Sequence, residues 1–240
     1  MFLRGVAFAA CLALVMAISA HETATANDDQ KFQATPFTFV GGAAQCGGVA
    51  GSRIVTAAWL SGMGLPDNGA LNTALTAARD PHFGLLLNKN GITPDCSSSG
   101  ARITGFNRGT TITELGFDYR TGGHCGAGAP RFNVVTTSGT RYFFGCIYGL
   151  HAPAPQDPLQ WTRVRFVAPT PGAEGFVFGS SEVQSISIVF DEGTDTASPD
   201  DPNGVGLAVL DNIDINGNLI TRGPGNSGDN DNNDEGNDHN

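Results

Sequence analysis

The sequence predicts an all-β fold, an antiparallel β-sandwich that is jelly-roll-like and contains at most one short helix. Three observations support this class. About ten to twelve short segments show the alternation or the β-branched and aromatic content of strands. The chain of 240 residues contains 33 Gly and 13 Pro, which supply turns and disfavour helices. Strands do not alternate with helical segments, so a parallel sheet is not expected.

The first residues have the pattern of a secretory signal peptide, which we expect to span residues 1–20. Arg4 precedes an apolar run that ends in small residues. The run is shorter than the roughly 20 residues of a membrane-spanning helix. We therefore expect cleavage, a secreted or extracytoplasmic protein and no membrane span in the mature chain. Residues 21–32 are expected to form a flexible mature N-terminus.

The last segment, residues 223–240, contains no aliphatic or aromatic residue. Such a segment has no apolar surface to bury, so we expect a disordered acidic tail. The two ends carry most of the formal net charge of -10, which leaves the domain between them close to neutral. The chain lacks the basic footprint of a nucleic-acid binder, so no nucleic-acid partner is expected.

The β-sandwich domain is expected to occupy residues 33–222. Within residues 111–119, Leu115, Phe117 and Tyr119 share the face predicted to lie in the core. Ser138-Gly139 predicts the turn of a hairpin, and Asn216-Gly217 is a second strong turn signal. Residues 68–79 have helical spacing of Leu and Ala and precede a proline, which predicts one short helix. In chain order, the predicted strands cover residues 37–40, 53–57, 84–88, 102–105, 111–119, 132–137, 140–146, 161–167, 183–190, 206–210 and 212–220.

Four cysteines remain after removal of the signal segment, which contains Cys11. An even number in an exported chain predicts two disulfides, with three possible connectivities. Cys125 and Cys146 flank the predicted hairpin and are the preferred pair, which leaves Cys46 with Cys96. Zinc is the alternative, because His124 adjoins Cys125, but no CxxC pair is present.

Catalytic signatures are sparse in the chain. The G-x-S-x-G, H-E-x-x-H and P-loop motifs are absent from the sequence. A glycosidase needs two carboxylates across a cleft, and Glu114 and Glu182 are the candidates for that reading. The glycine-rich residues 122–128 precede no helix and are interpreted as a tight surface loop.

Aromatic residues on the predicted strands are candidates for ligand binding. Sugar rings pack their C–H faces on aromatic planes. We therefore consider Tyr142, Tyr148 and Trp161 as a stacking surface, with burial in the core as the alternative. Fifteen of the aromatic residues are Phe, which favours core filling for the class as a whole.

Acidic residues gather between residues 191 and 201 and return on the last predicted strand. Calcium takes six to eight oxygen ligands, so Asp191 and Asp211 are candidate ligands of a structural calcium. A solvated acidic loop is the alternative interpretation. No other cofactor is expected.

Residues 206–215, which read GLAVLDNIDI, resemble the final strand of jelly-roll carbohydrate-binding modules. The resemblance implies a sandwich fold, and in some of those modules an Asp at the place of Asp211 helps to hold a structural calcium. Residues 115–119 and 125–133 resemble uncharacterised exported bacterial proteins, which implies no activity.

The function expected from these observations is a secreted, non-catalytic extracellular binding protein whose partner is a glycan or another cell-surface component. A glycosidase-like secreted hydrolase of sandwich fold is one alternative. A purely structural cell-surface protein is the other.

Overall fold

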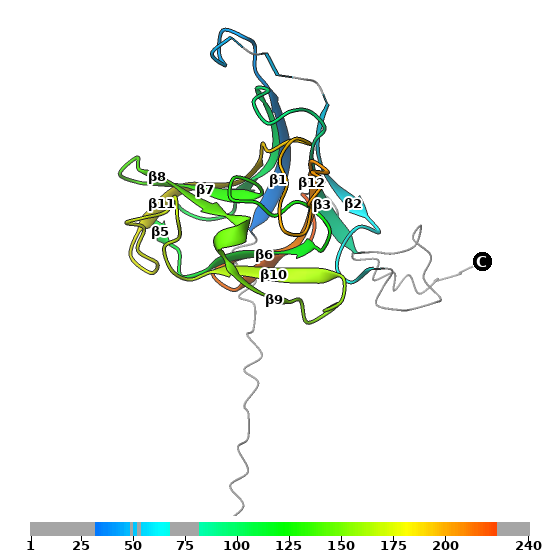
Figure 1. Ribbon diagram of the computed structural model, residues 1–240. Helices are drawn as coiled ribbons and strands as arrows, with labels where there is room; N and C mark the ends of the chain where they lie inside the picture. Colours follow the sequence, from blue (N-terminus) through cyan, green and yellow to red (C-terminus); the bar gives the residue numbers. More distant parts are fainter. Residues whose placement is uncertain (1–31, 49, 52–53, 68–81, 225–240) are drawn as a thin grey trace, which may run out of the picture.

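The fold is an antiparallel β-sandwich, as predicted. A computed structural model describes residues 32–48, 50–51, 54–67 and 82–224. Within these residues the strands form two sheets that pack face to face (Figure 1). The expected signal peptide, the predicted helix at residues 68–79 and the acidic tail from residue 225 lie outside the described residues. Phe32, placed by sequence in the flexible N-terminus, is buried in the core and lies 6.4 Å from the ring of Phe106.

The first sheet carries one wall of the core. Its strands pair antiparallel throughout, and the β7–β8 hairpin turns at Ser138-Gly139, where Gly139 has a φ of 87°. In spatial order the sheet consists of β1 (Gln33–Val40), β4 (Ser97–Thr104), β11 (Glu182–Phe190), β7 (Arg131–Thr136) and β8 (Arg141–Gly145), with β5 (Thr110–Thr111) beside β11.

The second sheet carries the opposite wall, and the chain passes repeatedly between the two sheets, as in jelly-roll topologies. A 3₁₀ turn, η3 (Cys146–Tyr148), connects the first sheet to an edge strand of the second. In spatial order the second sheet consists of β2 (Val55–Ser61), β3 (Phe83–Lys89), β12 (Leu207–Ile215), β6 (Leu115–Arg120), β10 (Trp161–Phe166) and β9 (Leu150–Pro153), with β13 (Asn218–Ile220) beside β12.

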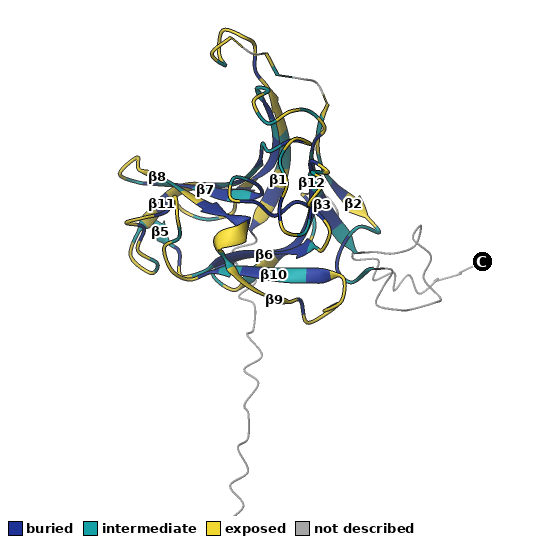
Figure 2. Ribbon diagram, in the orientation of Figure 1, coloured by how far each residue is buried: buried dark blue, intermediate teal, exposed yellow. Residues whose placement is uncertain are grey.

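Phenylalanine rings fill the space between the sheets. Phe117 of β6 lies 5.6 Å from Phe132 of β7, and Phe144 of β8 lies 5.7 Å from Phe166 of β10. These contacts join strands of opposite sheets, and all four side chains are buried. Figure 2 shows the same pattern, with buried strands inside and exposed residues on η3 and β9. The aromatic composition is thus used mainly for the core.

Two disulfides hold loops to this frame. Cys46 is bonded to Cys96, and Cys125 is bonded to Cys146, which is the pairing favoured by the sequence. The first disulfide holds the segment after β1 against the start of β4. The second closes the segment that contains the β7–β8 hairpin. Both disulfides fit an oxidising, extracytoplasmic environment.

Candidate functional site

A pocket of about 350 Å³ opens at the end of the sandwich where β1, β3 and β11 finish and β4 begins. We call it the end pocket. Antiparallel pairing aligns these termini, because Val40 lies opposite Ser97 and Phe190 lies opposite Ser99. Segments far apart in sequence therefore meet at one place. The residues that matter for its chemistry are Phe39, Lys89, Asp95, Ser97, Asp191 and Glu192.

Lys89 is the structural centre of the end pocket. Its side chain is fully buried, and Nζ donates to the carbonyl oxygens of Thr93 at 2.9 Å, Asp95 at 2.8 Å and Asp191 at 2.8 Å. An ammonium group has three donors, so all of them are used. Burial lowers the pKa of Lys89, whereas the neighbouring acidic residues oppose that shift. One buried cation thus joins the 93–95 loop to the end of β11.

Each carboxylate of the end pocket is held by its own partner. Arg131 binds Asp191 with two parallel hydrogen bonds, from Nη1 at 2.6 Å and from Nη2 at 2.8 Å. The hydroxyl of Ser97 donates to Asp95. His124 Nε2 lies 2.7 Å from Oε2 of Glu192. These contacts restrict the carboxylate rotamers, so the acceptors of the pocket are positioned before a ligand arrives.

Phe39 supplies the apolar wall. It is the seventh residue of β1 and its side chain is 45% exposed although it lines the pocket. An exposed ring beside oriented carboxylates combines a flat apolar surface with hydrogen-bond acceptors.

The three aromatic residues proposed from sequence are not brought together. Trp161 is only 1% exposed, because the chain around Leu65 and Ala154 covers it, and its Nε1 donates to Asp67 at 2.6 Å. The expectation that Trp161 offers a stacking surface is therefore wrong. Tyr142 is half-buried against Phe176 at 5.3 Å. Tyr148 is 41% exposed, on η3, and does not line the end pocket.

The two candidate calcium ligands serve different parts of the fold. Asp191 follows β11 and pairs with Arg131, as described above. Asp211 lies on β12 in the other sheet, where it accepts hydrogen bonds from the backbone N–H of Leu65 at 2.8 Å and of Asn212 at 2.6 Å. The structure thus assigns each carboxylate to protein donors and does not place the two in one ligand cluster.

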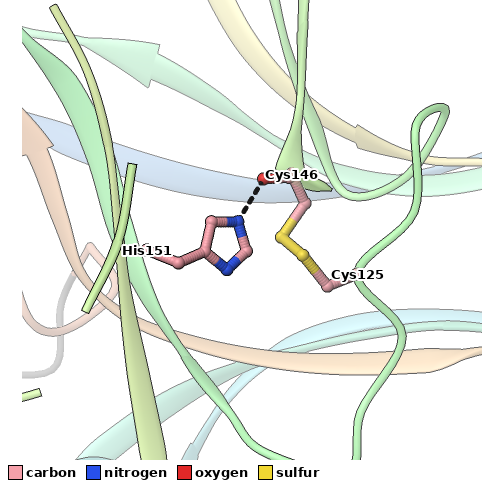
Figure 3. A group of neighbouring side chains, drawn as sticks. All are labelled: Cys125, Cys146 and His151. Carbon is pink, nitrogen blue, oxygen red and sulfur yellow. Dashed lines mark hydrogen bonds between the residues drawn. A yellow bond between two sulfur atoms is a disulfide. The ribbon is translucent and has the colours of Figure 1, made fainter. Parts of the chain in front are cut away.

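Within the described part of the chain, one group of three metal-type ligands lies close together: Cys125, Cys146 and His151 (Figure 3). The two sulfur atoms are bonded to each other, so neither is a thiolate that binds metal. His151 Nε2 lies 2.9 Å from the carbonyl oxygen of Cys146. The zinc alternative is not supported either, because both ring nitrogens of the neighbouring His124 contact carboxylates.

The two glutamates considered for a hydrolase lie outside the end pocket. Glu114 pairs with Arg165 at 3.1 Å, and Glu182 accepts a hydrogen bond from Thr137 at 3.3 Å. The pocket instead contains Glu192, which the sequence placed in the acidic loop without a specific role. No sequence motif marks Phe39, Lys89 or Asp95 as site residues.

Fold and site together define a disulfide-bonded antiparallel β-sandwich with a carboxylate-lined pocket at one end. No protein-family model matches the chain, and no curated protein and no solved structure shows significant similarity to it. Among the described residues, no helix has the length and apolar character needed to cross a membrane.

Proposed function

We propose that the protein is an extracytoplasmic binding protein that recognises a glycan in the end pocket. The observation that carries this proposal is the exposed ring of Phe39 beside the carboxylates of Asp95, Asp191 and Glu192. Sugars present C–H faces that pack on a ring and hydroxyl groups that donate to carboxylates. The pocket offers both kinds of contact within the volume of a small-ligand site.

The construction of the pocket also supports binding. Ordering flexible side chains costs free energy when a ligand binds. Arg131, Ser97 and His124 already hold the three carboxylates, so little further ordering is needed. Lys89 holds the loop and strand end that carry Asp95 and Asp191.

The expected compartment is consistent with a glycan partner. The two disulfides fit an oxidising environment, and the sequence predicts export. Polysaccharides and glycosylated surfaces are exposed to proteins in that environment.

A polysaccharide pull-down followed by a glycan array tests the proposal. We expect the wild type to be retained on at least one glycan and Phe39→Ala to lose at least tenfold in affinity, because the stacking wall is removed. Tyr148→Ala is the matched control, since Tyr148 is an aromatic residue of similar exposure, 41% against 45%, outside the pocket.

Retention of no glycan by the folded wild type contradicts the proposal. Equal retention of wild type and Phe39→Ala, with a loss in Tyr148→Ala, instead places the glycan near η3.

A further inference from the structure

The side-chain donors that line the end pocket are already engaged by the protein. Lys89 uses its three N–H donors for backbone carbonyl oxygens. The hydroxyl of Ser97 donates to Asp95, and the hydroxyl of Thr93 donates to Asp195 at 2.8 Å. A ligand that needs a donor from these groups would have to displace a protein acceptor.

The acceptors of the end pocket, in contrast, are not used up. His124 contacts Oε2 of Glu192 at 2.7 Å, whereas Oε1 has no donor among the described residues. A β-carbon at Gly128 would collide with Oε1, so this oxygen stays uncovered because residue 128 has no side chain. Each oxygen of Asp191 accepts one hydrogen bond from Arg131 and has a second lone pair. The pocket is therefore better suited to a ligand that donates hydrogen bonds than to one that accepts them.

The charges around the end pocket do not cancel. Hydrogen bonds from Thr93 lower the pKa of Asp195, which keeps this carboxylate ionised beside the pocket. His124 lies between Glu192 and Asp201, so even a doubly protonated ring offsets only one of these two carboxylates. The acidic side chains that line the pocket or contact its 93–95 loop outnumber the neighbouring cations: Asp95, Asp191, Glu192 and Asp195, against Lys89 and Arg131. The net charge next to the ligand is thus negative in either protonation state of His124.

The exposed ring of Phe39 favours the same kind of ligand. The face of an aromatic ring is the negative side of its quadrupole, so it attracts an ammonium group as well as C–H groups. A sugar with a free amino group supplies a C–H face, hydroxyl donors and an ammonium with three donors. Acetylation removes the charge of that nitrogen, and an acidic sugar would place its carboxylate against those of the pocket.

We propose that the glycan recognised in the end pocket is an amino sugar whose free, protonated amino group binds Oε1 of Glu192. The inference rests on the proposed glycan binding and names the class of sugar. His124 fixes the carboxylate through Oε2, and the Glu192 side chain is only 17% exposed. A charge-assisted hydrogen bond in such a partly buried position is stronger than one on an open surface.

Matched pairs of oligosaccharides test the proposal. Short glucosamine and galactosamine oligomers, with the amino groups either free or acetylated, are added to the glycan array together with the corresponding neutral oligomers, and affinities are measured by calorimetry. We expect the wild type to bind a free-amino oligomer at least about tenfold more tightly than its acetylated form. We expect this affinity ratio to fall as the salt concentration is raised, because the interaction is between charges.

Variants separate the pocket from general attraction of cations. The net charge of -10 attracts any polycation, so the loss of a negative charge is compared at two positions. Glu192→Gln is expected to reduce the affinity ratio by about tenfold, towards one. Glu182→Gln removes the same charge from an exposed glutamate of β11 outside the pocket and is expected to keep the wild-type ratio.

Circular dichroism and thermal unfolding check that both variants fold, and the matched pairs on the wild type remain decisive if Glu192→Gln does not. An affinity ratio near one in the wild type, or a preference for acidic glycans, overturns the inference and leaves the proposed binding function intact. A ratio that survives Glu192→Gln, or falls equally in Glu182→Gln, overturns the role of Glu192. Retention of no glycan of any class overturns the proposed function itself.

Discussion

The surroundings of the Lys89 ammonium resemble a binding site for a metal cation, with oxygen atoms converging on a positive charge. Three backbone carbonyl oxygens converge on its Nζ within 2.9 Å, and acidic residues surround it. Carbonyl and carboxylate oxygens are also the ligands that calcium prefers. Here the positive charge at which these oxygen atoms converge is supplied by the covalently attached ammonium of Lys89.

Replacement of this side chain tests its role. Lys89→Met keeps most of the volume but leaves three buried carbonyl oxygens without their donor. We expect a loss of about 3 kcal/mol or more in the free energy of unfolding, measured by urea denaturation. Arg141→Met, which removes an exposed cation on β8, is expected to change stability by less than about 0.5 kcal/mol.

The same account predicts that a calcium chelator leaves the thermal midpoint of the wild type unchanged. A large chelator-dependent loss of stability, together with a neutral Lys89→Met variant, contradicts the role of Lys89.

At the scale of elements, alternation predicted most strands because most strands of the sandwich have one face in the core. Leu115 and Phe117 of β6 are buried as expected. The edge strand β9 was not predicted, because its sequence LHAP has no alternation and all four residues are exposed. Residues 150–153 are recognised as a strand only through their antiparallel pairing with β10.

The two last predicted strands, at residues 206–210 and 212–220, are continuous in β12 as far as Ile215, and residues 218–220 form the separate strand β13. The strand β12 contains an irregularity. The pairing register with β6 shifts between Asp211 and Asp214, and Asn212 has a φ of 44°. A bulge depends on how the partner strand pairs, and the hydrophobic pattern alone does not reveal it. The turn at Asn216-Gly217 was predicted correctly and connects β12 to β13.

This irregular strand carries a pH-sensitive carboxyl group. Burial, together with the charge of Asp118 opposite it, raises the pKa of Asp211 from 3.8 to about 7, although two backbone N–H donors oppose the shift. The folded state therefore holds the proton more tightly than the unfolded chain. Its contribution to stability is fully present below about pH 4 and is lost as the pH rises to about 7.

We expect Asp211→Asn to flatten the stability profile between pH 4 and 7. The wild-type contribution falls by at most about 1.4 kcal/mol for each pH unit in this range, which is the value for one proton. Urea unfolding at several pH values measures the slope. Glu174→Gln, an exposed control, is expected to keep the wild-type slope. An identical slope in Asp211→Asn shows that Asp211 does not hold the proton.

The end pocket was the part least accessible to sequence reasoning. Alternation places residues on a face of a strand, but the pocket forms where strand ends from both sheets and two loops meet. Asp191 and Glu192 were noted within an acidic loop, whereas their partners Arg131 and His124 lie on other segments. Those long-range pairs decide which carboxylates are oriented and which are merely solvated.

At the scale of the whole molecule, the phenylalanine core and the two disulfides stabilise the packing of the two sheets and their loops. The Cys125–Cys146 bond closes a segment with a sequence separation of 21 residues. In the chain-entropy account, a loop of this length corresponds to about 3 kcal/mol of stabilisation. The double variant Cys125→Ala with Cys146→Ala is expected to lose that amount.

Thermal and urea unfolding with and without dithiothreitol measures this loss. We expect the reductant to lower the stability of the wild type more than that of the double variant, because the double variant retains only Cys46–Cys96. Equal stability of wild type and double variant under oxidising conditions contradicts the structural role of Cys125–Cys146.

The most direct test of the central claim locates the bound glycan on the molecule. A short oligosaccharide of the glycan retained in the pull-down is titrated into the isotope-labelled protein, and amide chemical-shift changes are mapped by NMR. The account predicts that the largest changes fall on Phe39, Asp95, Gly128 and Glu192, the residues that line the end pocket. Changes concentrated on η3 and β9, or on the outer face of the second sheet, contradict it.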